Sequence, residues 1–175
     1  MTFKQTKLPG VFEVELELTH DDRGFFARTW CEREFRDKGL SHRVVQCSVS
    51  FNLRMATLRG MHFQADSMPE AKLVRCTRGS AYDVILDLRR ESPSFRDWTA
   101  VVLTAASRNS VYVPEGCAHG FLTLEDTTEL VYQMSEFYDP KLSRGVRWND
   151  PAFGIVWPRM PEVISERDRT YPNFE

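Results

Sequence analysis

The sequence predicts an all-β fold, an antiparallel sandwich or small barrel. Short apolar segments recur along the 175 residues, turn residues separate them, and one short helix signal interrupts them. The chain has no composition shift and no Ser/Gly/Pro-rich linker, and it is long enough to bury a substantial core. We therefore expect residues 1–175 to form a single domain, a β-barrel with a lined interior.

The first expected strand covers residues 12–18, where four apolar residues from Phe12 to Leu18 alternate with three glutamates. A strand with one apolar and one charged face is typical of a sheet edge. Residues 21–24, Asp-Asp-Arg-Gly, predict a turn. Residues 31–38 predict a short helix that Gly39 ends as a C-cap.

From residue 44 onward the pattern predicts strand after strand. The expected strands are 44–51, 57–64, 72–76, 80–88, 98–104, 110–113, 120–124 and 129–135, with turns notably at 77–79 and 114–116. The C-terminal segment is too rich in proline and aromatic residues for a regular element, yet too apolar to be disordered. We expect it to pack across the barrel as an irregular segment.

Composition excludes several kinds of partner. The net charge is −2 and no basic stripe is present, so we expect no nucleic acid partner. The N-terminus lacks the apolar stretch of a signal peptide and no run of eighteen apolar residues occurs, which predicts a cytoplasmic protein without a membrane span. Four widely spaced cysteines predict buried free thiols rather than a zinc or dithiol site.

His62 is the first candidate for chemistry, because imidazole titrates near neutral pH and can act as a general base. Within the strand 57–64 it falls in phase with Leu58, Gly60 and Gln64, so it points into a cavity if that face lines the barrel. A core histidine satisfied by a hydrogen bond is the alternative. Arg59 faces the other way unless a bulge at Gly60 changes the phase.

Lys72 and Tyr132 are candidates of lower specificity. Lys72 begins a strand and could place an ammonium beside a developing enolate oxygen, although a solvated lysine is the commoner case. Tyr132 shares a strand face with Leu130 and Met134, which suits either a core tyrosine or an acid that reprotonates a carbanion. Together with His62, these residues suggest proton transfer beside a carbonyl, the chemistry of an epimerase.

His119 raises the question of a metal. Residues 114–121 are similar to the P-x-G-x-x-H pattern with which metal-binding cupin barrels supply one histidine ligand. The partner H-x-H motif is absent, because Gln64 occupies the place of the second histidine and neutral glutamine is a poor replacement for imidazole. We expect a metal-free barrel.

Five segments of the chain closely resemble the dTDP-4-dehydrorhamnose 3,5-epimerase family, and the likeness covers nearly the whole chain. The segments are 58–64, 72–76, 83–89, 114–121 and 165–169. The resemblance implies a cupin-like jelly roll with short helices, acting as a homodimer and without a metal or other cofactor. It also implies a substrate in which a nucleotide diphosphate carries a 4-keto-6-deoxyhexose.

The resemblance further implies roles for individual residues. His62 would be the base, Asp168 its orienting partner, Tyr132 the acid and Lys72 the group that stabilises the O4 enolate. By its position, Asp168 would otherwise be read as part of a solvated charge run. The residues implied to hold the sugar nucleotide or to line its cleft are Arg23, Gln46, Ser48, Arg59, His119, Tyr138 and Arg167.

Three positions depart from the family pattern on the implied nucleotide-binding surface. Arg28 and Ser143 stand where glutamate is common, and Ser48 stands where asparagine is common. A guanidinium cannot form the hydrogen bonds that an acid accepts, so the sequence leaves open whether the nucleotide is dTDP, CDP or GDP. It also leaves open whether C3, C5 or both are inverted. Two alternatives are a metal-dependent cupin oxygenase or isomerase and a sugar-nucleotide binding protein without turnover.

Overall fold

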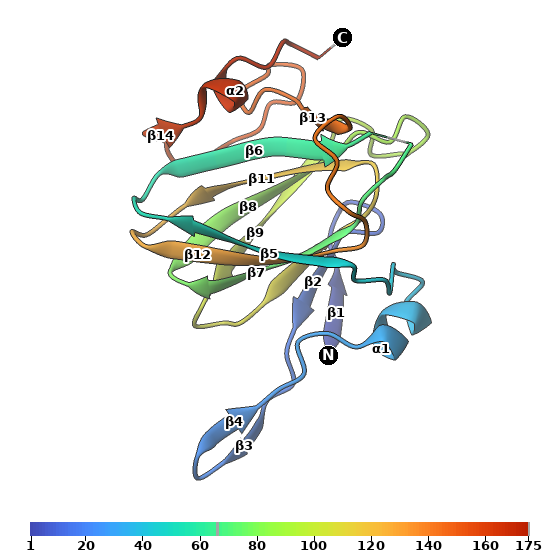
Figure 1. The fold of residues 1–175 in the computed structure, drawn as a ribbon, viewed down its shortest axis with the longest axis vertical. Coiled ribbons are helices and arrows are strands. Elements are labelled where there is room, and N and C mark those ends of the chain that lie inside the picture. The colour runs from blue at the N-terminus through green and yellow to red at the C-terminus, as the bar shows by residue number, and fades with distance from the viewer. Residues whose placement is uncertain (66, 175) are drawn as a thin grey trace.

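The computed structural model describes residues 1–65 and 67–174 as two packed β-sheets (Figure 1). Strands alternate inward-facing and outward-facing side chains, so each sheet turns one face to its partner. The first sheet is antiparallel, and its strands in spatial order are β1 (Thr2–Gln5), β2 (Phe12–Glu15), β10 (Ser110–Val113), β7 (Lys72–Arg78), β12 (Thr128–Met134) and β5 (Gln46–Asn52).

The second sheet carries the remaining long strands. Its order is β13 (Ser143–Gly145), β6 (Thr57–Gln64), β11 (Cys117–Thr123), β8 (Ser80–Asp87) and β9 (Trp98–Thr104), and β14 (Val163–Ile164) pairs in parallel with β6. Outside the two sheets lie the hairpin β3 (Thr19–Asp21) and β4 (Gly24–Phe26), and the helices α1 (Glu32–Asp37) and α2 (Glu166–Arg169). The all-β prediction is confirmed, but the sheets stay open at their edges, so the expected barrel is a two-sheet sandwich.

The main core forms between the sheets from alternate residues of facing strands. Val74 of β7 and Leu130 of β12 meet Ile85 of β8 and Phe121 of β11, and all four are buried. Tyr132, two residues after Leu130 on the same face, packs against this cluster. The apolar alternation therefore gives way to polar side chains at one end of the sandwich.

A bulge in β6 decides which side chains face that end. Opposite β11, His62 pairs with His119 and Arg59 with Phe121, so β6 has one more residue than its partner over this stretch. Gly60 lies in the extra step with φ +128°, and a Cβ there would meet the Cα atom of Gly120 at 2.5 Å. The bend required to bring Arg59 to the face of His62 is present.

Two predictions at the ends of the chain need correction. The strand expected over residues 12–18 ends at Glu15 and lies between β1 and β10, because β1, not predicted, forms the edge. The C-terminal segment from residue 148 onward contains β14 and α2, although most of it is irregular as expected. It packs through Phe153 and Trp157 against the outer face of the second sheet.

The hairpin β3–β4 projects away from the sandwich in Figure 1. Helix α1 follows it, close to the predicted bounds, and Gly39 with φ +70° stands just after its last turn. No helix in the described part of the chain is long and apolar enough to cross a membrane.

Candidate active site

A cavity of about 820 Å³ opens between the two sheets at the polar end of the core. Strands β5, β7 and β12 of one sheet and β6 and β11 of the other line it, together with the segment from β14 to α2. Ten of the eleven side chains expected at the site lie on its wall. They are Gln46, Ser48, Arg59, His62, Lys72, His119, Tyr132, Tyr138, Arg167 and Asp168.

His62 and Asp168 form a hydrogen-bonded pair although 106 residues separate them. The Nε2 atom of His62 lies 2.6 Å from Oδ1 of Asp168, and Oδ2 of Asp168 accepts from the backbone N–H of Gly60 at 3.2 Å. Ser165 caps α2 by accepting from the Asp168 N–H at 3.1 Å. Burial alone would raise the pKa of Asp168, but the hydrogen bonds from His62 and Gly60 outweigh it and lower that pKa.

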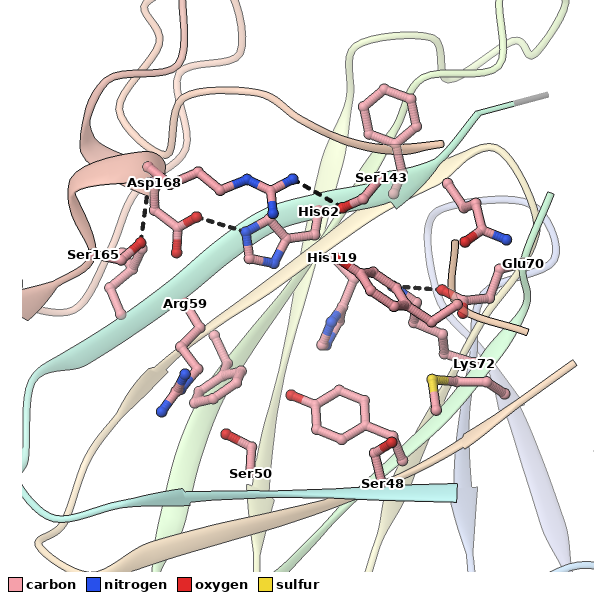
Figure 2. Close-up of a pocket in the computed structure, with 18 of the residues that line it drawn as sticks. Ser48, Ser50, Arg59, His62, Glu70, Lys72, His119, Ser143, Ser165 and Asp168 are labelled. Atoms are coloured by element: carbon pink, nitrogen blue, oxygen red, sulfur yellow. Dashed lines mark hydrogen bonds and ion pairs between the residues drawn. The ribbon is translucent and has the colours of Figure 1, made fainter. Parts of the chain in front are cut away.

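The bond to Asp168 determines which ring nitrogen of His62 is free. Because the low pKa keeps Asp168 ionised, neutral His62 donates its Nε2 proton to the carboxylate and carries its lone pair on Nδ1. Figure 2 shows the second ring nitrogen of His62 turned away from Asp168 and toward the cavity. The arrangement presents Nδ1 as a base to whatever occupies this space.

Tyr132 approaches the cavity from the opposite sheet. It lies on β12, whereas His62 lies on β6, and both side chains line the same space. Its ring meets that of His119 edge to face, with centroids 5.9 Å apart. Desolvation inside the protein raises the pKa of Tyr132 above its ordinary value, so the phenol keeps its proton at neutral pH.

Lys72 is held by a carboxylate that sequence reasoning missed. Its Nζ atom lies 3.0 Å from Oε1 of Glu70, and the two side chains are only 13% and 6% exposed (Figure 2). Glu70 also lines the cavity. Glu70 lies two residues before Lys72, and residues two apart on a strand share a face, so the spacing could have indicated this pair. It was missed because Glu70 lies before the first residue of β7.

A second buried pair joins His119 to Asp83. The Nε2 atom of His119 lies 2.8 Å from Oδ2 and 2.9 Å from Oδ1 of Asp83, and both residues are almost fully buried. Burial raises the pKa of Asp83 despite the opposing attraction of His119. Asp83 is an acid within the apolar run of β8, and a buried acid needs a polar partner, so the sequence could have indicated a buried pair here.

Gln64 stands at the position of the second histidine of metal-binding cupins, and its side chain forms hydrogen bonds with backbone groups. Its side-chain amide donates to the carbonyls of Met68 and Phe137, and its Oε1 accepts from Asp139. No group of three or more His, Cys, Asp or Glu side chains suited to a metal occurs among the described residues.

Two guanidinium groups reach the cavity with neutral partners. Arg59 donates from Nε to Oδ1 of Asn52 at 2.8 Å, and Arg167 donates from Nη2 to Oγ of Ser143 at 2.9 Å. Neither arginine forms an ion pair within the described parts of the chain. Their charge is available to an anionic ligand.

Gln46 and Tyr138 meet at the wall of the cavity, where the Tyr138 backbone N–H donates to Oε1 of Gln46 at 3.2 Å. Ser48 follows on the same face of β5, two residues after Gln46. Ser48 and Ser143 therefore place short hydroxyl side chains on the cavity wall.

Arg23 is the exception among the expected site residues. It lies at the tip of the projecting hairpin, its side chain is 89% exposed, and its guanidinium pairs with Asp21 at 2.6 Å. The chain does not bring Arg23 to its own cavity, because the hairpin extends away from the sandwich (Figure 1). Arg28 also lies outside the cavity wall, where it pairs with Glu34 at 3.0 Å.

Comparisons with known proteins agree with this geometry. The sequence profile of the family described as dTDP-4-dehydrorhamnose 3,5-epimerase matches residues 5–175. The chain belongs to this family. A curated dTDP-4-dehydrorhamnose 3,5-epimerase from Methanothermobacter thermautotrophicus is 42% identical over 172 residues, which cover 97% of this chain and 92% of the relative.

Solved structures of similar proteins superpose closely on the sandwich. A dTDP-4-dehydrorhamnose 3,5-epimerase from Bacillus anthracis, with TDP and PPi bound, has a TM-score of 0.94 at 36% identity and 99% coverage of both chains. A 3′-monoepimerase from Streptomyces bikiniensis, in complex with dTDP-quinovose, has a TM-score of 0.87 at 31% identity, with 96% of this chain and 85% of that chain covered. The cupin-like jelly-roll prediction and the expected enzyme class, an epimerase, are confirmed.

Proposed function

We propose that this protein inverts C3, C5 or both in a 4-keto-6-deoxyhexose that is linked to a nucleotide diphosphate. The observation that carries the proposal is a base and an acid on opposite walls of one cavity, His62 on β6 and Tyr132 on β12. Inversion at carbon requires removal of a proton from one face and its return to the other. Two facing sheets supply those two directions.

The proposed reaction uses the acidity that a ketone confers on its neighbours. The C4 carbonyl acidifies the protons on C3 and C5, and Nδ1 of His62 removes one of them while Asp168 stabilises the imidazolium that forms. The ammonium of Lys72 stabilises the negative charge that develops on O4. Tyr132 then donates its proton to the opposite face of the same carbon. Before the next turnover the His62 imidazolium loses its proton to solvent and the phenolate gains one from solvent.

Arg59 and Arg167 fit the diphosphate, because a planar guanidinium grips two oxygens at once and neither group is neutralised by a carboxylate. Solved relatives bind TDP with PPi and dTDP-quinovose, which supports a nucleotide sugar as ligand. We infer that Gln46, Ser48, His119 and Tyr138 complete its binding surface. Solved structures similar to this chain include 3,5-epimerases and a 3′-monoepimerase, so the number of centres inverted is left to experiment.

We also infer a homodimer in which the hairpin of one subunit reaches the cavity of the other. The edge strand β5 exposes Val49 and Phe51, and the hairpin exposes Phe26 with 79% of its surface accessible. Apolar groups exposed on an edge strand and on a projecting hairpin favour association. In that arrangement Arg23 would meet the substrate of the partner subunit.

Two further expectations remain part of the proposal. A single domain is supported by one core cluster to which both sheets contribute. A cytoplasmic location is supported by four cysteines that are all free thiols.

Solvent deuterium exchange tests the proposed function. In D₂O we expect deuterium at C3, C5 or both of a dTDP-, CDP- or GDP-linked 4-keto-6-deoxyhexose, measured by mass spectrometry, and we expect His62→Ala to abolish the exchange. A circular dichroism spectrum matching that of the wild type is the control for folding. Absence of exchange with every substrate in folded wild-type protein would defeat the proposal, and tight binding without exchange would indicate a binding protein.

A further inference from the structure

Tyr171 lies against the proposed base but outside the cavity. It follows α2, three residues after Asp168, and its ring meets that of His62 edge to face with centroids 6.3 Å apart and planes at 69°. The cavity wall includes His62 and Asp168 but not Tyr171. Tyr171 therefore contacts the imidazole from the protein side rather than from the substrate side.

The contact relies on the ring of Tyr171 rather than on its hydroxyl. The hydroxyl oxygen is buried and has no hydrogen-bond partner, which costs free energy in a folded protein. A phenylalanine would fill the same space without that cost. The Arg167 guanidinium carbon lies 5.8 Å from the centre of the same ring, and its charge opposes the rise that burial causes in the pKa of the phenol. The edge-to-face packing of the Tyr171 ring with His62 is the direct contact with the proposed base.

Gly145 has no side chain and so leaves the space that the Tyr171 ring fills. It pairs with His62 across β13 and β6, and a Cβ atom added to it would lie 2.3 Å from Cζ and 2.7 Å from the hydroxyl of Tyr171. Gly145 is not among the residues with a left-handed backbone, so its conformation is open to alanine. What prevents a side chain at this position is the ring of Tyr171.

We propose that Tyr171, seated on Gly145, is a positioning residue that holds the imidazole of His62 in the orientation in which Nε2 meets Asp168 and Nδ1 faces the cavity. The terminal torsion of histidine has broad, roughly two-fold minima, so one hydrogen bond leaves the ring free to tilt or turn over. An aromatic edge packed beside it removes that freedom. The catalytic consequence depends on the proposed epimerase function, but the orientation itself does not.

Four variants test the proposal: Tyr171→Leu, Tyr171→Phe, Gly145→Ala and the double variant Gly145→Ala/Tyr171→Leu. We expect Tyr171→Leu to lower kcat roughly tenfold to a hundredfold, because small misplacements of a reacting group have effects of that size. Tyr171→Phe should recover most of that loss, since it keeps the ring. Gly145→Ala should reproduce the loss by displacing the ring, yet cause little further loss when Tyr171 is already leucine.

Nitrogen-15 NMR of the ligand-free protein provides a readout independent of turnover. The His62 signals are assigned by their absence in His62→Ala, and in the wild type the neutral ring should be protonated at Nε2. Tyr171→Leu and Gly145→Ala should mix the two tautomers, whereas Tyr171→Phe should not. If the protein proves inactive on every keto sugar, this measurement still decides the positioning role.

Three results would overturn the inference. They are an unchanged His62 tautomer in Tyr171→Leu, a kcat for Tyr171→Phe as low as that of Tyr171→Leu, and additive losses in the double variant. Additive losses would show that Gly145 and Tyr171 act separately. A change confined to the melting temperature, with kcat and tautomer unaffected, would assign Tyr171 a structural role only.

Discussion

Asp168 and Tyr132 differ in the direction in which the protein shifts their pKa values. Hydrogen bonds from His62 and Gly60 overcome burial and lower the pKa of Asp168, while burial raises that of Tyr132. At neutral pH the carboxylate is therefore ionised and the phenol is protonated. These are the states that an orienting partner of a base and a proton donor each require.

Removal of the Tyr132 hydroxyl should separate the two halves of the reaction. In Tyr132→Phe, His62 and Asp168 remain in place, so proton abstraction should continue while inversion falls by roughly a hundredfold or more, the usual contribution of a general acid. Deuterium exchange compared with product stereochemistry measures the two steps. Full inversion by this variant would show that another group is the acid.

At the scale of the element, the bulge in β6 determines which of its side chains face the cavity. A regular strand would place Arg59 on the face opposite His62, and the extra residue at Gly60 turns both toward the cavity. The same bend brings the Gly60 N–H to the carboxylate of Asp168. One glycine thus links the position of Arg59, which we expect to bind the substrate, to that of the His62–Asp168 pair.

Gly60→Ala should therefore harm both stability and activity. The new Cβ would meet backbone atoms, the Gly120 Cα at 2.5 Å and the His119 carbonyl at 2.9 Å, in a strand at φ +128°. We expect a loss of roughly 3 kcal/mol in the free energy of unfolding, from crowding and backbone strain together. Chemical denaturation measures it.

Gly154→Ala is the matched control for Gly60→Ala. Gly154 also has positive φ, +58°, but nothing lies within 4 Å of an added Cβ. Backbone strain alone should cost about 1 kcal/mol there. Equal losses in the two variants would show that the bulge at Gly60 is not crowded.

At the scale of the whole molecule, one residue expected at the site lies outside the cavity of its own chain. Ten expected residues line the cavity, but Arg23 lies on a hairpin that projects from the sandwich (Figure 1). A homodimer with exchanged hairpins would place it at the partner's cavity. The dimer would then be a requirement of activity and not only of stability.

Complementation between inactive variants tests this arrangement. When Arg23→Ala and His62→Ala subunits form a mixed dimer, one of its two cavities receives an intact His62 and an intact Arg23 if the hairpins exchange. We expect kcat/KM to recover to about half of the wild-type value in purified mixed dimers, since one of two symmetric sites is whole. If Arg23 serves its own chain, no site is whole and no recovery should occur.

Local patterns were sufficient for the class of the fold and for most of the strands. Short apolar segments mark β6, β8 and β12, a turn at Gly79 marks the start of β8, and Gly39 marks the end of α1. The extent of the first strand was wrong, because the register of its partner β1 and not its own alternation decides where pairing ends. Pairing partners are a property of the sheet, which a local window does not contain.

The sequence by itself determined the all-β class, the family and the residue types available for proton transfer, because periodicity and motifs are local. The resemblance implied that Asp168 orients His62, and the tertiary structure brings the two together across 106 residues. Only the tertiary structure showed that buried Glu70 and Asp83 hold Lys72 and His119. It also placed Arg23 outside its own cavity. Hydrogen bonds and ion pairs act over a few ångströms in space, and distance along the chain says nothing about that separation.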